Sequence, residues 1–97
     1  MTITNKIGSV TKTVAAVNDA TAWMTIPRRA LVSVSVEGGA FVATIALQRS
    51  FDGGVTPFTI ESYTVATEKN TESAEEQAVR LICTAYTSGS PVLRLEF

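Results

Sequence analysis

The sequence predicts a small all-β domain: a single antiparallel β-sandwich, or a small barrel, of seven to eight short strands. Three observations support this. The β-branched residues Val, Thr and Ile make up 31 of the 97 residues, and these residue types favour strands. Several runs alternate between apolar and polar side chains, with turn signals at intervals of about 8–12 residues. No helix-period stretch is long enough to compete, and the length allows one domain, residues 1–97.

The central pair of strands has the clearest pattern. Residues 31–37 read L-V-S-V-S-V-E, so three valines share one face of the strand and two serines the other. Gly38 and Gly39 then form a turn signal, and residues 40–50 alternate again. Two alternating runs joined by a short glycine turn predict a β-hairpin.

The remaining strands are predicted from weaker or shorter patterns. A turn at residues 52–54 is followed by a predicted strand at residues 58–65. Two further strands, at residues 78–86 and 92–97, are separated by a predicted turn at residues 87–91. Shorter or weaker candidates are residues 3–7, 11–17 and 22–26. Residues 1–17 are therefore expected to form an edge strand of this domain or an arm that engages a neighbouring subunit.

Composition excludes several classes of function. Eight Lys and Arg stand against nine Asp and Glu, so no basic excess is available to neutralise nucleic-acid phosphates. The chain has no His and one Cys, which excludes the usual zinc ligand sets, a His-based triad and an internal disulfide.

Cys83 lies in an apolar run and is expected to be a buried small hydrophobe. No run approaches the roughly 18 apolar residues of a membrane helix, and the first twenty residues do not resemble a signal peptide. We expect no enzymatic activity, no cofactor or metal, no nucleic-acid or membrane partner, and folding in a reducing cytoplasm.

Residues 67–78 differ from the rest in charge. They hold four Glu and one Lys, a local formal charge of −3, so the remainder carries +2 within a total of −1. Ser73 followed by Glu76 fits a capping box, which predicts a solvated loop with a single helical turn. Such an acidic loop could instead dock on a basic partner surface, and the basic pair after Pro27 could meet an acidic one. The candidate partner contacts are Arg28, Arg29, Glu68, Glu72, Glu75 and Glu76.

The motif S-F-D-G-G-V-T at residues 50–56 resembles the Asp-box, S-x-D-x-G-x-T-W, of sialidases and other β-rich proteins. The match covers Ser50, Asp52, Gly54 and Thr56 and departs from the motif at Pro57, where Trp is expected. An Asp at this position can accept bonds from backbone N–H groups, and glycines permit positive φ. In the families that carry it the Asp-box supports a hairpin, so the resemblance implies a structural turn.

Three aromatic residues have two interpretations. Trp23 is expected to be the main core aromatic, because a small domain needs large apolar anchors. Alternatively, Trp23, Tyr63 and Tyr86 form a platform for sugar rings, as in carbohydrate-binding modules built on β-sandwiches.

A wider pattern spans roughly residues 40–95. It consists of L-Q-R-S-F-D-G-G at 47–54, E-S-Y-T at 61–64, T-E-K at 67–69, E-E at 75–76, R-L at 80–81 and C-T-A-Y-T-S-G at 83–89. This set resembles small β-sandwich virion proteins of tailed bacteriophages. The resemblance implies a non-enzymatic capsid decoration or head-associated accessory subunit, folded in the host cytoplasm and located in the virion. Its implied partners are major capsid or connector and tail subunits and further copies of itself. A neck or tail component and a carbohydrate-binding host-recognition module are the alternatives.

Overall fold

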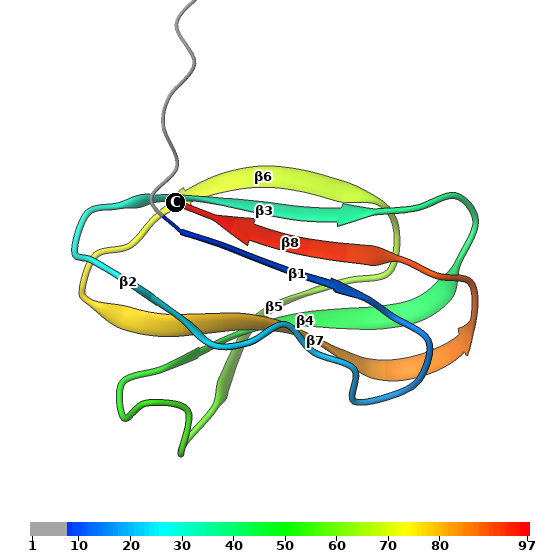
Figure 1. The fold of residues 1–97 in the computed structure, drawn as a ribbon, viewed down its shortest axis with the longest axis horizontal. Coiled ribbons are helices and arrows are strands. Elements are labelled where there is room, and N and C mark those ends of the chain that lie inside the picture. The colour runs from blue at the N-terminus through cyan, green and yellow to red at the C-terminus, as the bar shows by residue number, and fades with distance from the viewer. Residues whose placement is uncertain (1–7) are drawn as a thin grey trace, which may run out of the picture.

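The structure is a computed structural model that describes residues 8–97, and it shows two antiparallel four-stranded sheets packed face to face (Figure 1). The first sheet has the strand order β1-β8-β3-β6 and the second β2-β7-β4-β5. The strand bounds are β1 Ser9–Thr13, β2 Met24–Ile26, β3 Leu31–Glu37, β4 Val42–Ser50, β5 Phe58–Tyr63, β6 Thr67–Glu72, β7 Gln77–Ser88 and β8 Val92–Glu96. Neither sheet closes into a barrel, so the sandwich form of the predicted fold class is confirmed. The predicted hairpin of residues 31–37 and 40–50 is wrong, because β3 and β4 belong to different sheets and the chain around Gly38 and Gly39 crosses from one sheet to the other.

The core lies between the sheets and consists of the inward-facing positions of each alternating strand. Its fully or almost fully buried side chains are Ile26, Val32, Val34, Val36, Ile45, Leu47, Val79, Leu81, Cys83, Leu93 and Leu95. Each such aliphatic side chain stabilises the fold by about 1.5–3 kcal/mol through its removal from water. The predicted burial of Cys83 is confirmed, and burial raises the pKa of its thiol.

The prediction of a loop with a helical turn at residues 67–78 is wrong. Residues Thr67–Glu72 form β6, which pairs antiparallel with β3 and is the edge strand of the first sheet. The backbone groups on that side of β3 need hydrogen-bond partners, and pairing outweighs the weak strand preference of Glu and Lys. At the expected cap, the Ser73 hydroxyl donates to the carbonyl oxygen of Glu75, and no helix is found in residues 8–97.

The N-terminal strand has different bounds from those predicted. Strand β1 spans Ser9–Thr13 and pairs with β8 of the same chain, at the other edge of the first sheet. The predicted strand at 11–17 stops early because the chain turns, with the Asp19 carboxylate accepting the backbone N–H groups of Ala15 and Ala16. The predicted strand at residues 3–7 lies outside the described residues.

Candidate functional site

The most prominent surface feature is the hairpin formed by β4 and β5, whose connecting loop extends away from the body of the sandwich (Figure 1). The two strands pair from Ile45 and Tyr63 to Arg49 and Phe58, with a register shift between Leu47 and Gln48. Such a β-bulge bends the strand that carries it.

The four residues that match the Asp-box lie together in the connecting loop and are linked by hydrogen bonds. The Ser50 hydroxyl donates to Asp52 Oδ1 (2.5 Å) and accepts the backbone N–H of Gly54 (2.8 Å). Asp52 Oδ1 also accepts the backbone N–H of Thr56 (2.9 Å). Gly54 and its neighbour Gly53 have φ values of +98° and +73°, which glycine adopts without strain. These contacts tie the start of the loop at Ser50 to its far side at Gly54 and Thr56.

The same hydrogen bonds control the ionisation of Asp52. The Ser50 hydroxyl, followed by the side chain and backbone of Thr56, lowers the pKa of the Asp52 carboxyl from 3.8 to about 2. Each bond favours the charged form of the acceptor. The carboxylate is therefore ionised over the whole range in which most proteins are studied.

We expect this carboxylate to make the loop sensitive to acid. Because its pKa is lower in the folded chain than in the unfolded chain, Asp52 stabilises the fold above pH 4. That contribution is lost as the pH falls from about 4 to about 2. The measurement is the free energy of unfolding of wild type and Asp52→Ala across this range, where the difference between them should shrink.

Asp52→Asn serves as the control, because it keeps an acceptor oxygen but cannot titrate. The free energy of unfolding of Asp52→Asn should therefore fall less between about pH 4 and about pH 2 than that of wild type, because the contribution of Asp52 ionisation is absent. A difference between wild type and Asp52→Ala that is constant from pH 5 to pH 2 would contradict the assignment, as would an ordinary Asp52 pKa in an NMR titration.

Trp23 lies against this loop, and its predicted place in the core is wrong. It directly precedes β2, where Met24 points into the core, so the Trp23 side chain lies on the outer face of the second sheet. Its ring contacts Gly54 so closely that a Cβ atom there would stand 2.7 Å from Nε1. The Arg80 guanidinium carbon lies 4.6 Å from the ring centroid on the same face. Pro57 stands at the motif's own tryptophan position, and the ring that packs on the loop comes instead from Trp23, which directly precedes β2.

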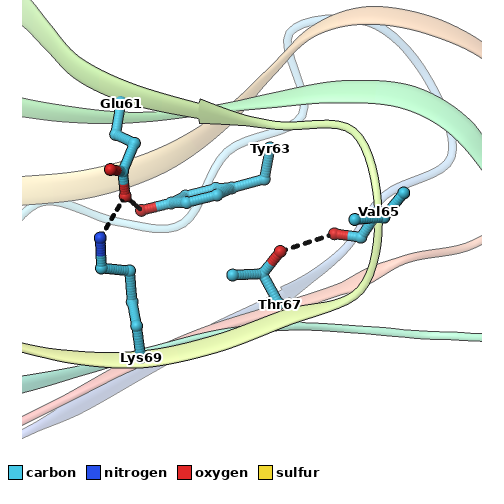
Figure 2. Close-up of polar contacts among 5 residues, drawn as sticks. All are labelled: Glu61, Tyr63, Val65, Thr67 and Lys69. Carbon is cyan, nitrogen blue, oxygen red and sulfur yellow. Dashed lines mark hydrogen bonds and ion pairs between the residues drawn. The ribbon is translucent and has the colours of Figure 1, made fainter.

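The three aromatic residues proposed as a sugar platform do not share a surface. Tyr63 belongs to the core between the sheets, whereas Trp23 is on the outer face of the second sheet. Figure 2 shows the Tyr63 hydroxyl donating to Glu61 (2.7 Å), whose carboxylate also binds Lys69 of β6 (2.5 Å). Tyr86 packs partly against the core, and its hydroxyl donates to the carbonyl oxygen of Gly89.

The contacts in Figure 2 join the two sheets at one end of β5. Lys69 and then the Tyr63 hydroxyl lower the pKa of the Glu61 carboxyl, while burial and Glu61 raise the pKa of Tyr63. The Thr67 hydroxyl donates to the carbonyl oxygen of Val65 within the connection from β5 to β6. The sandwich is therefore closed at the Tyr63 end of β5.

At the opposite end of β5 the hairpin exposes four large apolar side chains, which we call the hairpin surface. Their exposed fractions are 60% for Phe51, 81% for Val55, 61% for Phe58 and 47% for Ile60. The Arg49 guanidinium carbon lies 5.1 Å from the Phe51 ring centroid and 5.3 Å from that of Phe58, within cation–π range. The arginine stem and its charge therefore position the two exposed rings.

A pocket of about 310 Å³ separates the hairpin surface from the connection between β6 and β7. Leu47, Phe51 and Ile60 form its hairpin wall, and Glu72 and Glu75 lie on the opposite wall. Val32 of β3 and Thr71 of β6 line the pocket from the first sheet, so a gap separates that sheet from the inward face of the hairpin here. The gap leaves apolar side chains of the hairpin open to solvent or to a partner.

Most of the predicted partner contacts gather near this pocket. The backbone N–H of Arg29 donates to the carbonyl oxygen of Ser73, and the N–H of Ser73 donates to that of Ala30. This pairing places Arg28 and Arg29 beside the segment that contains Glu72, Glu75 and Glu76. Glu68 lies four residues before Glu72 on β6, or about 13 Å away along an extended strand.

Sequence reasoning missed Arg49, Phe58 and Ile60. A signal was present, because residues 58–63 carry three large apolar side chains, Phe58, Ile60 and Tyr63, at spacings that strict alternation cannot put on one face. The register shift opposite Leu47 and Gln48 brings Ile60 to the pocket that Leu47 also lines. Whether such side chains are covered depends on the extent of the opposing sheet.

Residues 8–97 contain no group of three or more His, Cys, Asp or Glu side chains that could hold a metal ion. In the same part of the chain no helix has the length and hydropathy needed to cross a membrane. Comparison with protein-family models, with curated proteins and with solved structures found no match.

Proposed function

We propose that this chain is a non-enzymatic structural subunit of a tailed bacteriophage particle that acts by protein–protein docking. Within the particle we propose a capsid decoration or head-associated accessory role. The observation that carries the docking proposal is the hairpin surface, where Phe51, Phe58 and Ile60 are exposed around shared pockets and Val55 is exposed in the same loop. Contiguous exposed apolar side chains at one place on a small domain are typical of an interaction site.

The construction of the loop supports docking in particular. The hydrogen bonds from Ser50 and Asp52 hold the loop, and Trp23 packs against Gly54 behind it. A surface that is ordered before it meets its partner loses less conformational entropy on binding. The Asp-box-like turn is thus interpreted as a support for the exposed rings of the hairpin.

The resemblance to phage virion proteins supports the identity of the assembly. Its segments at residues 47–54, 61–64 and 67–69 form the end of β4, the loop, the end of β5 and the start of β6. The first of these segments contains Phe51 of the hairpin surface. The proposed partners are major capsid subunits, connector or tail subunits and further copies of this chain. Repeated contacts in such an assembly would stabilise a domain of this size.

The test combines particle composition with a pair of matched variants. Mass spectrometry of purified mature virions should detect the chain, and its absence from them would reject the virion proposal. The variant Val55→Asp should lower the number of copies per particle about tenfold or more at limiting subunit concentration, because an aspartate replaces a buried methyl pair in the contact.

Val42→Asp is the matched control, because Val42 is also exposed (58%) but lies at the other end of β4. It should keep wild-type occupancy. Equal occupancy of wild type and Val55→Asp would contradict docking through the hairpin surface. A density map of the particle assigns the subunit to the head, the neck or the tail.

A further inference from the structure

The four sheet edges in the described part of the chain differ in how well they are protected from pairing with another chain. Strand β2 has only three residues, and β1 (SVTKT) is polar and carries Lys12. Strand β6 (TEKNTE) carries three charged side chains. Short edges and charged edges discourage strand addition. Strand β5 (FTIESY) is six residues long and begins with exposed Phe58 and Ile60, so its first half lacks this protection.

The position of β5 in the fold leaves this half accessible. It pairs with β4 on one side only, and the contacts of Glu61 with Lys69 close the sandwich at its other end. None of the loop, turn and cap hydrogen bonds between backbone groups of residues 8–97 involves a β5 residue. Unpaired edge groups next to an apolar patch are a template for another strand.

We propose that the hairpin surface and the edge of β5 dock on a second copy of this chain, with the two β5 strands antiparallel across a two-fold axis. The inference deepens the proposed function and rests on it, since it names the partner of the same surface. Antiparallel pairing about an axis perpendicular to the sheet joins the β2-β7-β4-β5 sheet of each copy to that of the other, which gives one eight-stranded sheet. It also keeps their inner faces on the same side, so that Phe58 and Ile60 of one copy lie beside those of the other.

The charges around the pocket favour a second copy of this chain over a partner whose contact surface carries charges of one sign only. Arg49, Glu72 and Glu75 line the pocket, and Arg28 and Arg29 lie beside Ser73 at its rim. A two-fold contact brings the same patch of both subunits together, so the patch must be complementary to itself. A patch of one sign would repel its own copy, whereas a patch of both signs can pair Arg with Glu across the axis.

The experiment is sedimentation equilibrium of the full chain over a wide range of concentrations. Wild type should show a monomer–dimer equilibrium, and Ile60→Lys should raise the dimer dissociation constant at least about tenfold by burying a charge in an apolar contact. Phe58→Lys is the second variant, because its side chain is 61% exposed and its replacement should leave the fold intact. Val42→Lys, at the far end of β4, should dimerise like wild type. Thermal melting of each variant checks its folding.

Amide hydrogen exchange supplies an independent measurement of the contact. Raising the concentration of wild type should slow exchange along β5 and leave β1, the edge of the other sheet, unchanged. A chain that stays monomeric at its highest soluble concentration would overturn the inference. So would a dimer that forms equally well in Ile60→Lys and Phe58→Lys.

The outcomes separate this inference from the virion proposal. A dimer that depends on Ile60, in a chain absent from mature particles, would reject the virion role and leave self-docking in place. A monomeric wild type whose Val55→Asp variant loses particle occupancy would reject self-docking and leave the docking of the hairpin surface on other virion proteins in place.

Discussion

Leu81→Ala is expected to lower the free energy of unfolding by about 3 kcal/mol, within the range for removing a leucine from a closed core. Leu81 is fully buried at the centre of β7, paired with Leu47 of β4, so the space left by its side chain cannot fill with water. For a domain of this size the melting temperature should fall by roughly 12–24 °C. Urea denaturation and thermal melting both measure the effect.

The neighbouring residue Ile82 provides the matched control. It points to the outer face of the same strand, is partly exposed, and forms an isolated β-bridge with Ala20. Ile82→Ala should therefore cost less, about 1 kcal/mol, since part of its side chain already contacts water. If the two variants lost equal stability, the assignment of the inward face of β7 would be wrong.

Gly89→Ala is expected to destabilise the fold by about 3 kcal/mol, through two separate costs. Gly89 has φ of +94°, where a residue with a Cβ atom is strained. A Cβ there would also stand 2.7 Å from the Cα of Phe41 and 3.1 Å from the carbonyl oxygen of Ala40. Both are backbone atoms, so the turn between β7 and β8 would have to move away from the start of β4.

Gly53→Ala separates the two costs. Gly53 also has positive φ, +73°, but a Cβ at this position meets no atom within 4 Å. Its replacement should cost about 1 kcal/mol from backbone conformation alone. Chemical denaturation of both variants measures the difference. Equal losses would mean that the contact with Phe41 and Ala40 relaxes without cost.

Much of the fold could be predicted because its signals are local. In β3 the alternation of valine with serine predicts which side chains are buried, and Val32, Val34 and Val36 all lie in the core. The Asp52 loop was also predictable, because the residues that bond to one another lie within seven positions of the chain.

The errors occur where distant segments decide the outcome. Residues 67–72 have the composition of a loop, and they become β6 because the edge of β3 needs hydrogen-bond partners. Trp23 is of a residue type that is common in cores. It lies on the outer face of the second sheet because Met24 takes the inward position and Gly54 offers a surface for the ring. Neither Gly54 nor β3 is close in sequence to the residue that it affects.

The β-branched residues and their alternation determined by themselves that this chain packs short strands into a sandwich or a small barrel, since a strand with one apolar face must bury it. The tertiary structure decided for the sandwich, because neither sheet closes on itself. Only the tertiary structure decided which apolar side chains remain exposed. Phe58 and Ile60 have the same pattern as buried strand residues, but both are exposed, and a pocket separates Ile60 from the first sheet. Exposure of an apolar side chain on an edge strand depends on the extent of the opposing sheet, which no local pattern contains.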